Sequence, residues 1–124
     1  MSLERQRLGR QGETLACEEL ERLGYAIVAR GYRTRAGELD IVASDAGTVV
    51  FVEVKTRLDL SYGDPVEAVT PEKQRRVVAM ATDYVVRHDL DNTPCRFDVV
   101  TVDALVEPPR ITVYKDAFRP GGPW

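Results

Sequence analysis

The chain has 124 residues, of which 44% are hydrophobic, so it is long enough for one domain with its own hydrophobic core. Its formal net charge of −3 excludes a globally basic nucleic-acid-binding protein, and its apolar runs are too short to span a membrane. There is no apolar secretory signal at the N-terminus, and Cys17 and Cys95 lack partners at metal-binding spacing. We therefore expect a reduced, cytoplasmic protein with one domain over residues 1–116 and a frayed tail over residues 117–124.

The first half of the chain predicts one helix followed by three strands. Apolar residues recur at helical spacing over residues 4–23, and Gly24 is a suitable residue to end that helix. Strands are expected at residues 25–29, 38–43 and 48–55, and the polar residues 30–37 are expected to form a loop. Turn-forming residues 44–47 predict that the second and third strands form a hairpin.

The second half predicts a loop, a helix and two strands. Residues 58–69 are expected to form the loop, and Thr70-Pro71 is a typical helix start, with Thr as the N-cap and Pro in the first turn. The helix should run to about Arg87 and bury Val77, Val78, Ala81, Tyr84 and Val85. Strands are expected at residues 96–102 and 110–115, the latter at an edge. The order α-β-β-β-α-β-β predicts an α/β fold with a mixed sheet.

The segment "FVEVKTR" at residues 51–57 combines strand-forming residues with ionised ones. Side chains alternate across a strand, so Phe51, Glu53 and Lys55 share one face and the neighbouring valines share the other. A solvent-facing stripe gives the same alternation, but Phe51 indicates that this face is partly covered. Glu53 and Lys55 are therefore candidates for a site at the covered face.

Pairing the predicted hairpin brings further acids to this face. A four-residue turn over residues 44–47 places Glu38 opposite Glu53, and it places Asp40 diagonal to Glu53 on the same face. Glu13 lies about 90° from the centre of the first helix's apolar stripe, from where it can lean over the sheet. Three carboxylates and Lys55 leave an excess of negative charge that a divalent cation would neutralise. An all-oxygen ligand set of Glu13, Asp40 and Glu53 suits Mg²⁺ or Mn²⁺.

Acids, a hard cation and a neighbouring lysine together suit the hydrolysis of phosphodiester bonds. A bound metal polarises a phosphoryl oxygen and lowers the pKa of a bound water. The ammonium group of Lys55 can orient that water and stabilise negative charge in the transition state. The two-residue spacing of Glu53 and Lys55 projects both groups from one strand face.

Four segments of the chain resemble a known family. They are "GRQGETLA" at 9–16, "YRTRAGELDIVA" at 32–43, "VVFVEVKTR" at 49–57 and "YGDPVEAVTPEKQRR" at 62–76. Asp40 followed by Glu53-Val54-Lys55 resembles the PD-(D/E)xK nuclease signature, with Leu39 where that signature has proline. Taken together, the segments resemble the YraN-like family of bacterial proteins, which is related to archaeal Holliday-junction resolvases.

The resemblance implies a restriction-endonuclease-like fold, with an α-β-β-β-α-β core and a central mixed sheet flanked by helices. It also implies metal-dependent nuclease chemistry on DNA or RNA, with Asp40, Glu53 and Lys55 as the catalytic core and Glu13 as the first-helix acid. Gln74 matches a helix glutamine that lies near the lysine in related resolvases. Helical spacing also places Gln74 on the inward face, but a solvent-facing position in the first helical turn is equally compatible with the sequence.

Basic residues beside these segments are candidates for contacts with nucleic-acid phosphates, although a solvated surface gives the same count. They are Arg33, Arg35, Arg57, Lys73, Arg75 and Arg76. Two functional hypotheses follow. The first is a metal-dependent endonuclease acting on DNA, including branched DNA, either as a two-fold dimer or as a monomer that nicks. The second is a nucleic-acid-binding module with the same fold and little or no activity, which acts through a partner protein.

Overall fold

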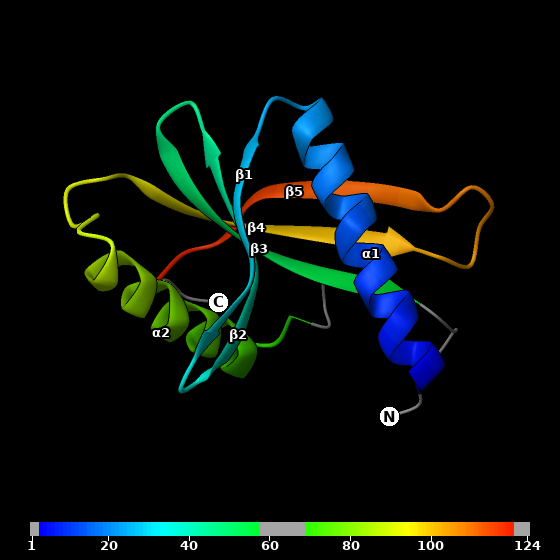
Figure 1. Cartoon of the computed structure of the whole chain (residues 1–124), viewed down its shortest axis with the longest axis horizontal. Coiled ribbons are helices and arrows are strands. Elements are labelled where there is room, and N and C mark those ends of the chain that lie inside the picture. The colour runs from blue at the N-terminus through cyan, green and yellow to red at the C-terminus, as the bar shows by residue number, and fades with distance from the viewer. Residues whose placement is uncertain (1–2, 58–68, 121–124) are drawn as a thin grey trace.

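The computed structural model describes residues 3–57 and 69–120, which form two helices and a five-stranded sheet (Figure 1). The order confirms the predicted succession of helices and strands. The elements are α1 (Leu3–Arg22), β1 (Ala26–Thr34), β2 (Gly37–Asp45), β3 (Thr48–Arg57), α2 (Pro71–Arg87), β4 (Cys95–Asp103) and β5 (Arg110–Phe118).

The sheet is mixed, as predicted, with the strand order β1-β2-β3-β4-β5. The central pair β3 and β4 is parallel, and all other neighbours are antiparallel. A parallel pair needs a long crossover connection, and here the connection contains α2. β5 is an edge strand, which confirms the position expected for residues 110–115. None of the helices in the described ranges is long and apolar enough to cross a membrane.

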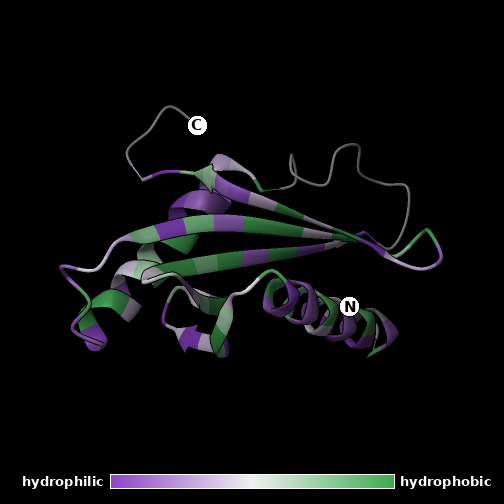
Figure 2. Cartoon of the chain, turned by 90° about the horizontal axis from the view of Figure 1, so that it is seen from above, coloured by the Kyte–Doolittle hydropathy of each residue, from purple (hydrophilic) through white to green (hydrophobic). Residues whose placement is uncertain are grey.

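The two helices pack against opposite faces of the sheet. Ala16 and Leu20 of α1 are buried with Val52, whereas Val77 of α2 is buried with Phe51, the neighbour of Val52 on β3. Adjacent strand residues point to opposite faces, so both faces of β3 are covered. Figure 2 shows hydrophobic positions along the strands and a mixture of hydrophobic and hydrophilic positions around α1, which is the pattern of an amphipathic helix.

α2 follows its predicted bounds closely. The side chain of Thr70 accepts a hydrogen bond from the Lys73 backbone N–H, and Pro71 begins the helix. Of the predicted core positions, Val77, Ala81 and Tyr84 are buried, while Val78 and Val85 are partly buried against the same cluster. Met80 is also buried, although the sequence analysis did not include it.

Two expectations for the first half of the chain were wrong. Residues 30–34 are part of β1 and not of a loop, because pairing with β2 satisfies their backbone groups while the edge position leaves polar side chains exposed.

The hairpin between β2 and β3 has a two-residue turn, in which Ala46 and Gly47 both have positive φ. Asp45 therefore pairs with Thr48, and Ile41 with Val52. Continued by one residue past its last pair, Ile41–Val52, this register puts Asp40, and not Glu38, opposite Glu53.

The C-terminal part differs from expectation at one end. The tail was expected to begin at residue 117, but β5 continues through Phe118. Phe118 is buried because its ring stacks on Phe97, with ring centroids 5.1 Å apart. Most of the loop expected at residues 58–69 lies outside the described residues, but Val69 at its end belongs to the core cluster beneath α2.

α1 comes very close to β3 near the end of that strand. A Cβ atom at Gly12 would collide with Oγ1 of Thr56. Only glycine therefore permits this approach between the helix and the strand. The contact brings the following residue, Glu13, to the part of the sheet that contains Asp40 and Glu53.

Candidate functional site

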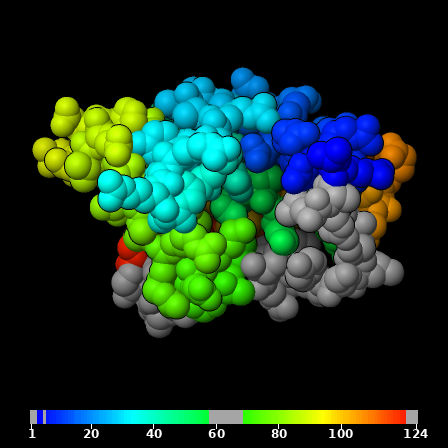
Figure 3. Space-filling view, turned by 60° about the horizontal axis from the view of Figure 1, so that its bottom comes forward, coloured from blue at the N-terminus to red at the C-terminus, as the bar shows by residue number. Residues whose placement is uncertain are grey.

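Three of the predicted acids act on one another where α1, β2 and β3 meet. Burial and then the charges of Glu53 and Glu13 raise the pKa of Asp40, and burial and then the charges of Glu38 and Glu53 raise the pKa of Glu13. In the space-filling view, atoms of β3 lie in a hollow between α1, the β1–β2 hairpin and the start of α2 (Figure 3). The structure thus brings these side chains into one region from three separate elements.

Asp40 lies where β2 and β3 stop pairing through their backbones. The last pair in the ladder is Ile41–Val52, and beyond it the Asp40 side chain accepts a hydrogen bond from the Val54 N–H, with 2.8 Å between Oδ2 and N. Burial first, and the charge of Glu53 second, raise the pKa of Asp40 to about 8. Without a further cation, Asp40 therefore keeps its proton near neutral pH.

Glu53 is a buried carboxylate with only 5% of its surface exposed, so the solvent-facing alternative does not hold for it. Its Oε1 lies 2.7 Å from the Nζ atom of Lys73, in the first turn of α2. Lys73 was expected among the phosphate contacts, and the structure instead places it against an acid of the candidate site. The ion pair satisfies a charge that would be costly to bury alone.

Glu13 is half-buried and has a cation of its own nearby. Burial, followed by the charges of Glu38 and Glu53, raises the pKa of Glu13, while Arg30 acts in the opposite direction. One guanidinium nitrogen of Arg30 lies 3.9 Å from Oε1 of Glu13 and donates to the Thr14 hydroxyl. Arg30 was not among the predicted site residues, because its approach to Glu13 depends on how α1 packs beside β1.

Glu38 lies at the margin of this region. It is exposed and forms an ion pair with Arg33, with 3.8 Å between the charged atoms. Gly31 has a positive φ of 61°, and a Cβ atom there would lie 2.7 Å from Oε1 of Glu38. Glycine is therefore needed at this position of β1 both for the backbone conformation and for the space beside Glu38.

Lys55 and Gln74 have different surroundings. Lys55 is half-buried on β3, two residues beyond Glu53 and level with Thr101 of β4. The amide nitrogen of Gln74 donates to the Val69 carbonyl at 3.0 Å, and its Oε1 is buried with no hydrogen-bond partner among the described residues. Gln74 thus points inward, which decides between the two orientations left open by the sequence.

The basic residues expected at the rim have varied partners. Arg57 lies 4.0 Å from a carboxylate oxygen of Asp103, and Arg76 lies 3.8 Å from Glu72. Arg35 is exposed in the turn between β1 and β2, and Arg75 is exposed on α2. The start of β2 approaches α2, since a Cβ atom at Gly37 would lie 4.0 Å from Cδ of Arg76. The arginines of the β1–β2 hairpin and of α2 therefore border the same side of the molecule.

The chemistry of the acids suits a hard cation, although their present arrangement does not form a coordination shell. Across residues 3–57 and 69–120, no group of three or more His, Cys, Asp or Glu side chains is placed to hold a metal ion. Glu53 contacts Lys73, Asp40 accepts from Val54, and Glu13 lies near Arg30. The oxygen donors, including Oε1 of Gln74, are nevertheless of the kind that Mg²⁺ and Mn²⁺ prefer.

A second charged cluster, which the sequence analysis missed, has a structural role. Asp98 on β4 is completely buried and accepts hydrogen bonds from the Tyr25 hydroxyl, the Arg96 guanidinium and the Asp116 backbone N–H. Arg96 also donates to Asp45 at the end of β2, at 3.0 Å. The spacing of Arg96 and Asp98 on one face of an apolar strand was a signal for this pair. The network joins four parts of the sheet and leaves the Asp98 carboxylate well satisfied.

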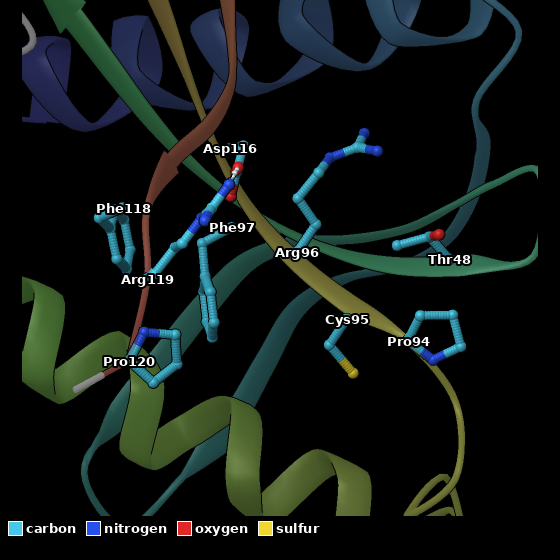
Figure 4. A pocket seen from close by; sticks show the side chains of 9 residues that line it. All are labelled: Thr48, Pro94, Cys95, Arg96, Phe97, Asp116, Phe118, Arg119 and Pro120. Atoms are coloured by element: carbon cyan, nitrogen blue, oxygen red, sulfur yellow. Dashed lines mark hydrogen bonds and ion pairs between the residues drawn. The ribbon is translucent and has the colours of Figure 1, made fainter. Parts of the chain in front are cut away.

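A cleft of about 460 Å³ lies at the start of β3 and β4 (Figure 4). On β3 this is the end of the strand before Glu53, on the N-terminal side. Two cations line it, but each is already paired: Arg96 with Asp98, and Arg119 with Asp116. The burial-raised pKa of the Cys95 thiol disfavours the reactive thiolate. The cleft is therefore a weaker candidate for chemistry than the region of Asp40 and Glu53.

Comparison with known proteins shows close relatives over nearly the whole chain. Residues 12–102 match the family described as "Uncharacterised protein family UPF0102". This range includes the three acids of the site together with Lys55 and Lys73. A UPF0102 protein of Dehalococcoides mccartyi is 42% identical over 118 residues, which cover 95% of this chain and 98% of the relative. Relatives in Symbiobacterium thermophilum and Anaeromyxobacter dehalogenans are 52% identical over 97 residues (78% and 82% of the two chains) and 46% identical over 121 residues (94% and 90%).

Proposed function

The chain belongs to the UPF0102 family, the YraN-like family that its motifs resemble, and from its site we propose that it is a metal-dependent endonuclease that hydrolyses phosphodiester bonds in DNA. The observation that carries the proposal is the pair Asp40 and Glu53. The Glu53 carboxylate is buried and the Asp40 carboxylate is half-buried at the point where β2 and β3 separate, and burial together with the charge of Glu53 raises the pKa of Asp40. Such an arrangement is costly for a purely structural purpose and is typical of a functional site.

The order of elements supports the further proposal of a restriction-endonuclease-like fold. The described chain runs α-β-β-β-α-β before its last strand, around a mixed sheet with one helix on each face. In this proposal Asp40 and Glu53 come from neighbouring central strands, and Glu13 is added by α1. Fold alone does not determine activity, so the assignment of function depends on the site residues.

Each site residue has a separate role in the proposed reaction. Glu13, Asp40 and Glu53 would hold Mg²⁺ or Mn²⁺, which supplies a polarised phosphoryl oxygen and an activated water. Lys55, on the same strand as Glu53, would stabilise the negative charge that develops on the phosphate. The unpartnered Oε1 of Gln74 is available to orient a water or a ligand at the start of α2. Exposed arginines such as Arg33, Arg35 and Arg75 would contact the substrate backbone.

A second candidate function has one observation in its favour. The described residues do not form a coordination shell as they stand, and Glu53 already has a counter-ion in Lys73. A nucleic-acid-binding module without activity, which works through a partner protein, would tolerate such an arrangement. It would bind nucleic acid equally well with and without a divalent cation.

Cleavage assays with variants of two site residues, Lys55 and Asp40, and with one control variant test the proposed activity. The wild-type protein is expected to cleave branched or linear DNA only when Mn²⁺ or Mg²⁺ is added. Lys55→Ala should reduce the rate by about 100-fold or more, the scale for losing a transition-state contact, while metal affinity stays near that of the wild type. Glu18→Gln, which removes an exposed acid from the same helix as Glu13, is the control and should cleave normally.

The outcomes separate the two functions. Binding of DNA without cleavage under every metal condition would support the binding module. Cleavage that Lys55→Ala leaves unchanged would reduce this lysine to a structural counter-ion, and it would point to a contaminating nuclease if Asp40→Asn were also unaffected. A parallel series with RNA identifies the substrate class.

A further inference from the structure

Lys73 joins the start of α2 to the most deeply buried acid of the site. Its backbone N–H donates to the Thr70 hydroxyl that caps the helix, which fixes the position of its Cα atom. Its Nζ lies 2.7 Å from Oε1 of Glu53. One residue thus connects the helix cap with the strand that carries Glu53.

The two partners of this ion pair differ in the free energy that each charge would cost if the pair opened. The side chain of Glu53 is 6% exposed, whereas that of Lys73 is 39% exposed. A buried carboxylate without a counter-ion is strongly disfavoured, but a half-exposed ammonium can return to water at small cost. Opening of the pair is therefore favoured when another cation replaces Lys73 at Glu53.

We infer that Lys73 is a positioning residue that occupies Glu53 in the metal-free protein, and that a divalent cation must displace its ammonium group to reach this carboxylate. The inference rests on the proposed function. Before displacement, Lys73 keeps Glu53 oriented and the start of α2 docked on β3. After displacement, its ammonium group stays beside the site, because Lys73 lies in the first turn of α2. There it can form an ion pair with a substrate phosphate.

Titration of Mn²⁺ into wild-type protein and Lys73→Gln tests this exchange. Removing the competing ammonium should tighten Mn²⁺ binding by about 2-fold to 5-fold, which corresponds to the loss of one partly exposed ion pair. In EDTA the same variant should have a Tm lower by roughly 5 °C or more, because Glu53 loses its counter-ion. Mn²⁺ should therefore raise the Tm of Lys73→Gln by more than it raises that of the wild type.

Two further variants make the result specific. Arg87→Gln removes another cation of α2, which is paired with Asp83 at 3.2 Å at the far end of the helix, and it should leave Mn²⁺ affinity unchanged. Lys73→Arg keeps the charge and should not tighten Mn²⁺ binding. If Lys73→Gln is unfolded in EDTA, recovery of its folded circular dichroism spectrum on addition of Mn²⁺ supports the exchange, and failure to recover overturns it.

The possible failures are distinguishable. Equal or weaker Mn²⁺ binding by Lys73→Gln, with binding by the wild type intact, overturns the exchange and leaves the proposed function standing. If neither protein binds Mn²⁺ or Mg²⁺, the metal-dependent function fails and the exchange fails with it. In that case a lower Tm of Lys73→Gln in EDTA shows that the ion pair is purely structural.

Discussion

The half-buried Asp40 and the buried Glu53 are neighbouring acids that are stabilised in different ways. Glu53 has an ammonium group at 2.7 Å, whereas Asp40 has one backbone N–H and a pKa raised to about 8. A count of charges alone would suggest that neutralising Glu53 stabilises the metal-free protein by reducing repulsion between the acids. The ion pair with Lys73 changes this expectation. Because Glu53 is paired, the acid whose neutralisation should stabilise the metal-free protein is Asp40.

The raised pKa of Asp40 predicts a specific dependence of stability on pH. In the unfolded chain this group ionises near 3.8, whereas in the folded chain it keeps its proton to about pH 8. The folded state therefore binds more protons in that interval, and the free energy of unfolding falls as pH rises from about 4 to about 8. Asp40→Asn removes this contribution, so it should be more stable than the wild type at pH 8 by about 1 kcal/mol or more.

Thermal unfolding in EDTA between pH 4 and pH 9 measures this effect. The curves of the wild type and Asp40→Asn should converge near pH 4 and separate as pH rises. Asp91→Asn, at an exposed position, is the control and should follow the wild type throughout. A difference between wild type and Asp40→Asn that is the same at every pH would show that Asp40 ionises normally in the folded chain.

At the scale of elements, the position of α1 depends on a glycine. Gly12→Ala places a methyl group against the Thr56 side chain, so α1 must move away from β3. Overpacking of this kind typically costs about 1–3 kcal/mol. The same displacement moves Glu13 away from Asp40, so we also expect weaker Mn²⁺ binding.

The same helix provides a matched control for this variant. A Cβ atom at Gly9 would have no neighbour within 4 Å, so Gly9→Ala should be neutral or stabilise the protein by up to about 1 kcal/mol through helix propensity. Denaturant unfolding of the two variants measures the difference. If Thr56→Ala does not restore stability to Gly12→Ala, the helix–strand contact is not the cause of the loss.

Elements with local determinants were predicted well from the sequence, and elements set by pairing were not. α2 was found with its first and last residues because Thr70 and Pro71 specify the cap locally. The length of β1 and the register of the β2–β3 hairpin depend on cross-strand pairing, and the sequence analysis misjudged both.

The same distinction applies to the site. Parity along β3 predicted that Glu53 faces a covered surface, and the structure buries it. The contacts of Glu53 with Lys73 and of Glu13 with Arg30 join elements that are distant in the chain, so no local spacing indicates them. The Asp98 network is of the same kind, since its partners come from the residue just before β1 and from the ends of β2 and β5.

At the scale of the whole molecule, the net charge of −3 requires any binding of nucleic acid to depend on local positive charge. Arg75 and Arg76 are exposed on α2, and Arg76 lies beside the start of β2. The double variant Arg75→Gln/Arg76→Gln should bind DNA more weakly. It should also flatten the dependence of log K on log salt concentration by about 1–2, since each phosphate contact contributes about 0.9.

Affinity for DNA measured at several salt concentrations tests this surface, with Mn²⁺ affinity measured in parallel. Arg22→Gln/Arg119→Gln is the control, because it makes the same change in net charge at exposed positions on α1 and after β5. Equal effects of the two double variants would mean that only total charge matters, and an unchanged slope would remove Arg75 and Arg76 from the interface.

The parallel pairing of β3 with β4 has a consequence for the protein during its synthesis. β3 leaves the ribosome before α2 and β4, so one of its two edges has no partner while the rest of the chain is being made. Unpaired edges of apolar strands promote aggregation, and charged residues within such strands oppose it. Glu53 ends the apolar run of β3 at residues 49–52, and Lys55 follows two positions later. Two of the residues proposed to act in the folded protein would therefore also disfavour wrong strand pairing while the chain is being made.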